Sequence, residues 1–150
     1  HALKMCQWLS EQGVVLIEQP MPKHMNEEHA WLCERVELPI IADEACQTYA
    51  DVAGLQPYYD GINIKLMKCG GVAEARKMIT LARELGMQVM IGCMTETSAG
   101  ISAATTLSPL VDYADLDGHV LLANDPYEGI QLVDGKLTLV NKPGTGVTLR

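Results

Sequence analysis

Charged side chains follow five apolar segments of this sequence, each at the point where a segment ends. The segments are "GVVLIEQP", "LPIIADE", "GINIKLMK", "MQVMIGCM" and "DYADLDG", and the charged residues are Glu18, Asp43 with Glu44, Lys65, Glu96, and Asp115 with Asp117. In a parallel α/β sheet or barrel, the carboxyl ends of all strands lie on one rim, where such folds place their chemistry. Six acids and one lysine at equivalent strand ends therefore predict one shared site.

Glu18 and Asp43 have the chemistry of metal ligands. They come from neighbouring segments, and their carboxylates are the hard oxygen donors that Mg²⁺ prefers. Two nearby carboxylates repel each other unless one takes a proton, and a divalent cation removes that penalty. The sequence therefore predicts a magnesium site between these two strand ends.

Lys65 follows on the next strand and is a candidate general base. A divalent cation close by disfavours the ammonium form, so the pKa of Lys65 should fall toward a value useful for proton abstraction. The alternative is that Lys65 only forms an ion pair with Asp43 or Glu44.

Asp115 and Asp117 are two residues apart, which places both on the same side of a strand. No basic residue lies near them in the sequence. We expect them to receive a cationic group from a ligand.

The elements that must position these residues are short strands separated by helices. Residues 2–12 have apolar residues at helical spacing, and "GGVAEARKMITLARELG" is the clearest amphipathic helix, closed by Gly86. This alternation predicts the α/β class with a right-handed, parallel βα array.

The third strand predicts which side chains share a face. We expect Ile62, Ile64 and Leu66 on one face, and Asn63 and Lys65 on the other.

The alternation of strands and helices ends after Gly118. "GIQLVDGKLTLVNKPGTGV" indicates a hairpin around Asp134 and Gly135, followed by a loop rich in glycine and proline. We expect this tail to leave the α/β layer and to pack on a different one.

Composition narrows the possible partners. The chain of 150 residues is 48% hydrophobic and 20% charged, with a net charge of −8, which disfavours nucleic acid and anionic membrane as partners. Five widely spaced cysteines without a C-x-x-C pair indicate reduced thiols in a cytoplasmic protein rather than disulfides or a zinc site. We find no signal peptide or spanning segment. The chain starts at His1 and runs directly into a helical pattern, so we expect it to be the middle of a longer protein.

The motifs "IEQP", "IADE", "INIKLMKCGG", "GCMTET" and "DLDG", in this order and spacing, resemble the C-terminal barrel of the enolase superfamily, which includes mandelate racemase and muconate lactonizing enzyme. Within it they are most similar to the muconate-lactonizing subgroup and its dipeptide epimerases. The resemblance implies about half of a modified TIM-type (β/α)7β barrel in residues 1–128, and a tail, residues 129–150, that returns to a capping domain. The first strand here corresponds to the family's fourth. The earlier K-x-K strand with the partner lysine, the strand with the third metal ligand and most of the cap are then missing.

The resemblance also implies roles. Glu18 and Asp43 are two of three Mg²⁺ ligands, and Lys65 is one of two lysines that face each other across the substrate α-carbon. Asp115 and Asp117 bind the α-ammonium group of a dipeptide.

Further residues match the family's pattern near the substrate. Cys93, Met94 and Thr95 occupy the loop that contacts the peptide unit. Glu96 corresponds to an acid of the subgroup and takes no role here. Lys68 is expected to be a solvated lysine at the end of a strand.

The activity implied is a Mg²⁺-dependent dipeptide epimerase that transfers the α-proton through an enediolate. The alternatives are another member of the superfamily, such as a muconate cycloisomerase or an o-succinylbenzoate synthase, or a half-barrel without catalysis. With one lysine and two metal ligands, the chain alone is expected to be inactive. Its expected partners are a dipeptide and either the missing N-terminal half or a second copy of itself.

Overall fold

The computed structural model describes residues 1–150 and contains a parallel sheet of five strands in the order β1-β2-β3-β4-β5. The strands are β1 Ile17–Glu18, β2 Ile40–Ala42, β3 Gly61–Lys65, β4 Gln88–Gly92 and β5 Tyr113–Ala114. Every neighbouring pair is parallel, from Ile17 opposite Ile40 to Met90 opposite Tyr113. The predicted parallel βα array is confirmed.

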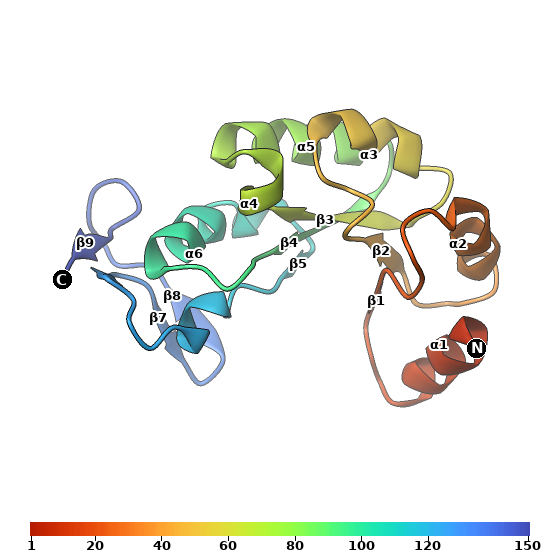
Figure 1. Ribbon diagram of the computed structural model, residues 1–150, viewed down its shortest axis with the longest axis horizontal. Helices are drawn as coiled ribbons and strands as arrows, with labels where there is room; N and C mark the ends of the chain where they lie inside the picture. The colour runs from red at the N-terminus through yellow and green to blue at the C-terminus, as the bar shows by residue number, and fades with distance from the viewer.

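Helices connect the strands. They are α1 Ala2–Glu11, α2 Asn26–Cys33, α3 Tyr49–Leu55, α4 Leu66–Cys69, α5 Val72–Glu84 and α6 Ser98–Thr105, with short 3₁₀ turns η1 Ser108–Leu110 and η2 Gly118–Leu121. Figure 1 shows α3 and α5 side by side on the same side of the sheet, above β3. The expected end of α5 is confirmed, since Gly86 has a φ of +73° and lies just beyond its last turn.

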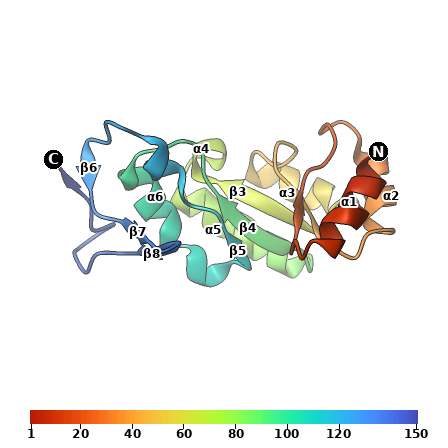
Figure 2. The ribbon, with the colours of Figure 1, turned by 90° about the horizontal axis from the view of Figure 1, so that it is seen from below.

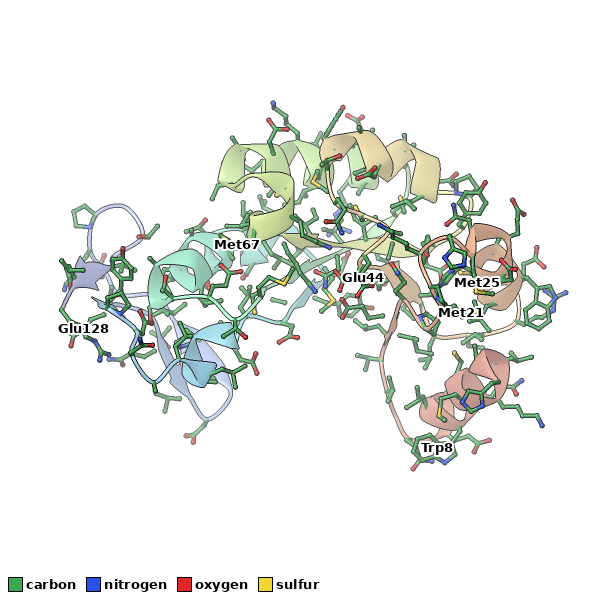
Figure 3. All side chains as sticks on the ribbon, viewed as in Figure 1. Trp8, Met21, Met25, Glu44, Met67 and Glu128 are labelled. Carbon is green, nitrogen blue, oxygen red and sulfur yellow. The ribbon has the colours of Figure 1, made fainter.

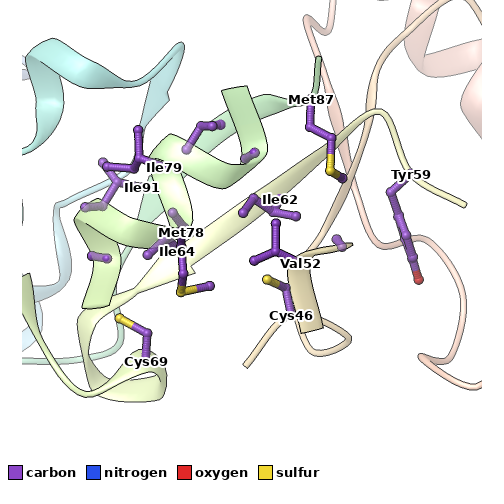
Figure 4. Close-up of a cluster of buried hydrophobic side chains, with 14 of the residues drawn as sticks. Cys46, Val52, Tyr59, Ile62, Ile64, Cys69, Met78, Ile79, Met87 and Ile91 are labelled. Atoms are coloured by element: carbon purple, nitrogen blue, oxygen red, sulfur yellow. The ribbon is translucent and has the colours of Figure 1, made fainter. Parts of the chain in front are cut away.

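The core lies between β3 and these helices. Ile62 and Ile64 are fully buried, and they point toward Val52 of α3 and Met78 of α5 (Figure 4). Because side chains alternate along a strand, Asn63 and Lys65 face the opposite side. The predicted division of faces is therefore confirmed within β3.

The end of the third strand was predicted wrongly. β3 ends at Lys65, and Leu66 begins the short helix α4 instead of continuing the strand to residue 68. Leu66 is buried, and Gly70 ends the helix with a φ of +93°. This early turn changes the position of Lys68, which lies in α4 instead of at the end of a strand.

The tail forms two small antiparallel pairs. Strand β6 Tyr127–Glu128 pairs with β9 Thr148–Leu149, and β7 Gln131–Val133 pairs with β8 Lys136–Thr138. Asp134 and Gly135 both have positive φ, +48° and +73°, as a two-residue hairpin turn requires. The predicted hairpin is confirmed.

The two ends of the chain lie far apart. The N- and C-termini are at opposite ends of the molecule in both Figure 1 and Figure 2. Trp8 projects outward from α1 with half its surface exposed (Figure 3). The structure contains no helix with both the length and the hydropathy that a transmembrane span requires.

Candidate active site

Three of the predicted site residues meet where β1, β2 and β3 end. Lys65 Nζ lies 2.7 Å from Asp43 Oδ2 and 3.8 Å from Glu18 Oε1. The parallel register brings them together, because Glu18 lies opposite Ile41 and Ala42 lies opposite Ile62. Glu44, in contrast, is exposed and forms no ion pair with Lys65.

Asn63 holds Glu18 in place. Its side-chain Nδ2 donates to Glu18 Oε1 at 2.6 Å, and the residue is 1% exposed. The amide lies against Gly92, where a Cβ would come within 2.7 Å of Asn63 Oδ1. The sequence alone indicates no function for Asn63, although the alternation along β3 places it on the same face as Lys65.

Lys68 is not the solvated residue that we expected. Its side chain is 6% exposed, and Nζ donates to Asp43 Oδ1 at 2.6 Å, to Asp43 O at 2.7 Å and to Asn63 O at 3.3 Å. The prediction failed because α4 turns the chain back immediately after Lys65. This turn buries the ammonium group of Lys68 against the backbone carbonyl and the carboxylate of Asp43.

Gln19, directly after β1, supports the backbone around Asp43. Its Oε1 accepts hydrogen bonds from the backbone N–H groups of Asp43 and Ala45, both at 2.9 Å. Gln19 also has a φ of +27°, which side chains other than glycine rarely adopt. The strained residue directly after Glu18 therefore fixes the loop that follows Asp43.

The charges of Asp43, Glu18 and Lys65 shift one another's pKa values. Burial raises the pKa of Asp43, but hydrogen bonds from Lys65 and Lys68 outweigh it and lower that pKa overall. Burial also raises the pKa of Glu18, and the nearby Asp43 adds to this, against the hydrogen bond from Asn63. Glu18 is thus a carboxylate held close to another carboxylate.

Lys65 is held as an ammonium ion in this arrangement. Burial alone would lower its pKa, but the hydrogen bond to Asp43 and the charges of Asp43 and Glu18 raise it. The ion pair with Asp43, considered above as the alternative to a catalytic role, is therefore present. The lowered pKa of Lys65 that we expected from the sequence applies to the site with a divalent cation bound beside it.

The aspartates after β5 lie on the surface. β5 ends at Ala114, so both residues follow the strand: Asp115 donates its backbone N–H to Ile91 O at 2.9 Å, and Asp117 directly precedes η2. Both are exposed on either side of the buried Leu116, and neither has an ion-pair partner in the chain. They are therefore free to receive a cation.

The loop after β4 lies next to these aspartates. A Cβ at Gly118 would collide with Met94 O, so the glycine of "DLDG" allows the two loops to touch. Burial raises the pKa of Cys93, and the charges of Asp115, Glu96 and Asp117 add to the rise. The predicted loop residues and the two aspartates thus form one cluster.

Glu96 and Thr95 line a hollow beside this cluster. Glu96 Oε1 accepts the backbone N–H of Met94 at 3.0 Å, and Oε2 is buried without a hydrogen-bond partner. The hollow has a volume of about 800 Å³, and Met67 of α4, seen in Figure 3, also lines it. Thr95 and Met94 are both exposed here.

The donor set suits a divalent cation. Two carboxylates converge on the point where Lys65 Nζ supplies the positive charge in this structure. The chain places no third His, Cys, Asp or Glu beside them to form a set of three. Glu18 and Asp43 thus fit two positions of an oxygen-rich site.

The profile of the family described as enolase C-terminal domain-like matches residues 1–150. The chain belongs to this family. The enolase-like chain is 56% identical over 147 residues to the L-Ala-D/L-Glu epimerase of Bacteroides thetaiotaomicron, covering 98% of this chain and 38% of that protein.

Two solved structures share the fold. The dipeptide epimerase of Enterococcus faecalis, complexed with Mg and L-Leu-L-Tyr, is 36% identical with a TM-score of 0.89, over 98% of this chain and 44% of that one. The substrate-liganded L-Ala-D/L-Glu epimerase of Bacillus subtilis is 30% identical with a TM-score of 0.88, over 97% of this chain and 43% of that one. The enolase-like chain therefore spans less than half the length of these relatives.

Proposed function

We propose that this chain forms one side of the active site of a Mg²⁺-dependent dipeptide epimerase and that Lys65 is its acid/base on one face of the substrate. The observation that carries the proposal is the contact of Lys65 Nζ with two carboxylates, 2.7 Å from Asp43 and 3.8 Å from Glu18. The relatives support it, because those described above are epimerases of dipeptides.

Glu18 and Asp43 hold the metal ion in this proposal. Burial and the nearby Asp43 raise the pKa of Glu18, and a divalent cation would relieve the repulsion between the two carboxylates. When bound, Mg²⁺ supplies positive charge that stabilises the negative charge developing on the substrate carboxylate.

Lys65 removes the α-proton from the face of the substrate that it meets. For this its amine must be neutral, and its only ion-pair partners here are Asp43 and Glu18. If a divalent cation engaged both carboxylates, the hydrogen bond to Asp43 and the charges of Asp43 and Glu18 would no longer raise the pKa of Lys65 as they do here. Burial, which lowers that pKa, would then favour the neutral amine.

Asp115 and Asp117 bind the substrate's α-ammonium group. Both carboxylates are exposed and unpaired, and they lie beside the loop of Cys93, Met94 and Thr95, which contacts the peptide unit in this proposal. A muconate or succinylbenzoate substrate has no ammonium group. The aspartate pair therefore favours a dipeptide over the substrates of a cycloisomerase or an o-succinylbenzoate synthase.

The other half of the site comes from outside the chain. Epimerisation needs an acid/base on the opposite face of the α-carbon, and Lys68 is bound to Asp43 and Asn63 instead. We assign residues 1–128 to the barrel and residues 129–150 to the return toward a capping domain. A complementary segment, or a second copy of the chain, then covers the free edges of β1 and β5.

The location in this proposal is the cytoplasm. All five cysteines are free thiols, as is usual in a reducing compartment.

Reassembly tests the proposal. The chain is mixed with the N-terminal part of the Bacteroides relative, and conversion of L-Ala-L-Glu to L-Ala-D-Glu is followed by chiral chromatography. We expect conversion only when both parts and Mg²⁺ are present. Lys65→Met should abolish it, whereas Lys77→Met, which removes the same charge from an exposed pair with Glu74, should not. A complex that assembles but converts nothing, or one that works with Lys65→Met, overturns the proposal.

A further inference from the structure

Lys68 is fixed more firmly than Lys65. Two of its three acceptors are backbone carbonyls, Asp43 O at 2.7 Å and Asn63 O at 3.3 Å, and its side chain is 6% exposed. The carbonyl group of Asn63 lies within β3 and that of Asp43 directly follows β2, so both are held by the sheet and stay in place whatever binds at the rim. The ammonium group of Lys68 therefore remains where it is when the site is occupied.

The two oxygens of Asp43 consequently differ. Oδ1 accepts from the fixed Lys68 at 2.6 Å, whereas Oδ2 accepts from Lys65 at 2.7 Å. The carboxylates are the only hydrogen-bond or ion-pair partners of Lys65 Nζ, so a cation that engages them displaces it. Oδ2 can be vacated for a metal ion, and Oδ1 cannot.

We infer that Lys68 restricts Asp43 to a single metal-binding oxygen and thereby makes the site selective for Mg²⁺ over Ca²⁺. The inference rests on the proposed magnesium site and adds a role for a residue outside the ligand set. Mg²⁺ takes six oxygens in near-ideal octahedral geometry, for which a carboxylate binding through one oxygen is suited. Ca²⁺ takes six to eight oxygens and gains from carboxylates that bind through both.

The charge of Lys68 has a separate effect. A fixed positive charge beside the site weakens the binding of any divalent cation, and Mg²⁺ and Ca²⁺ carry the same charge. Removing the charge should therefore strengthen both affinities by a similar factor. Only the blocking of Oδ1 changes the ratio of the two affinities.

The experiment titrates the ¹⁵N-labelled chain with MgCl₂ and, separately, with CaCl₂. The backbone amides of Asp43 and Ala45 report binding by NMR, which measures the millimolar dissociation constants expected of a site with few ligands. The variants are Lys68→Met, which has no donor, and Lys68→Arg, which keeps one. Lys77→Met is the control for charge, because Lys77 is exposed and pairs only with Glu74.

We expect the ratio of the Ca²⁺ to the Mg²⁺ dissociation constant to fall about tenfold in Lys68→Met. It should stay near the wild-type ratio in Lys68→Arg and Lys77→Met. An unchanged ratio in Lys68→Met, with both ions bound at Asp43, overturns the inference and leaves the magnesium site standing. A wild-type chain whose amides at Asp43 and Ala45 respond to neither ion overturns both.

The wild-type chain provides a second measurement if Lys68→Met does not fold. With ¹³C-labelled aspartate carboxylates, the separation of the antisymmetric and symmetric infrared stretches distinguishes binding through one oxygen from binding through two. Subtracting the spectrum of Asp43→Asn isolates this residue. We expect the one-oxygen pattern with both ions, and a two-oxygen pattern with Ca²⁺ contradicts the inference.

Discussion

Lys65 Nζ donates to Asp43 Oδ2 at 2.7 Å, so the proposed acid/base and a proposed metal ligand form one ion pair. Whatever engages Asp43 takes a partner away from Lys65. The raised pKa of Lys65 and the lowered pKa of Asp43 are two sides of this contact, each working against burial. The pair therefore links occupation of the site to the protonation of its base.

Replacing Asp43 by Asn should destabilise the chain. The change takes away the only carboxylate of Lys68, whose side chain is 6% exposed, and leaves Lys65, 14% exposed, with Glu18 alone at 3.8 Å. Removing one partner of a buried ion pair lowers the free energy of unfolding by roughly 3 kcal/mol. Unfolding by urea measures the loss, and Glu74→Gln, which breaks an exposed pair with Lys77, should change little.

The same contact predicts a dependence on pH. The folded pKa of Asp43 is below its unfolded value, so its contribution to stability is present above about pH 4 and is lost as the pH falls through the folded pKa. In Asp43→Asn, the free energy of unfolding should therefore fall less steeply as the pH is lowered below about 4. If the free energy of unfolding falls equally steeply with acid in wild type and variant, the ion pair contributes nothing to stability.

Glu18→Gln should stabilise the metal-free chain while weakening its binding of Mg²⁺. Glu18 has a raised pKa through burial and the charge of Asp43, and Gln carries no charge yet still accepts the hydrogen bond from Asn63. Because the pKa of Glu18 is higher in the folded than in the unfolded chain, its contribution to the free energy of unfolding is lost as the pH rises through the folded pKa. We expect a melting temperature a few degrees higher for the variant at neutral pH. A lower melting temperature would contradict the claim that the charge of Glu18 beside Asp43 destabilises the metal-free chain.

Replacing both Asp115 and Asp117 by Asn should selectively weaken binding of a dipeptide with a free α-amino group. The reassembled enzyme is titrated with L-Ala-L-Glu and with its N-acetyl form, and the two dissociation constants are compared. Asp134→Asn combined with Glu74→Gln, which removes the same two negative charges away from the site, controls for the change in net charge. If both ligands lose affinity equally, the aspartates do not read the ammonium group and the proposed substrate class is wrong.

The features that the sequence predicted follow from local patterns. Apolar runs and glycines locate the parallel strands and helices, the alternation along β3 places Lys65 opposite the core, and Asp134-Gly135 specifies the hairpin. The meeting of Glu18, Asp43 and Lys65 follows from the same topology, because the carboxyl ends of parallel strands share one rim.

The features that the sequence missed depend on contacts between distant segments. The hydrogen bonds of Lys68 to Asp43 arise from the turn into α4, which the apolar run "INIKLM" conceals. Asn63 and Gln19 are polar residues whose roles appear only when β1 and β2 lie beside them. Neither residue type predicts a partner without that tertiary arrangement.

The chain should self-associate in the absence of a complementary segment. The outer edges of β1 and β5 are unpaired, and Trp8 and Trp31 are about half exposed. Sedimentation velocity at micromolar concentration is expected to show dimers or larger species that dissociate on dilution. A monomer at all concentrations contradicts this expectation.

Exchange of the α-hydrogen in deuterated water tests most directly the central claim that Lys65 moves the α-proton. The chain alone is incubated with Mg²⁺ and either L-Ala-L-Glu or L-Ala-D-Glu, and deuterium at the glutamate α-carbon is followed by NMR. One base can remove and return a proton on its own face, so we predict slow exchange of one epimer only, without epimerisation. Lys65→Met should reduce it at least about 100-fold, and Lys77→Met should not. Exchange that survives Lys65→Met, or epimerisation in both directions by the chain alone, would contradict the account.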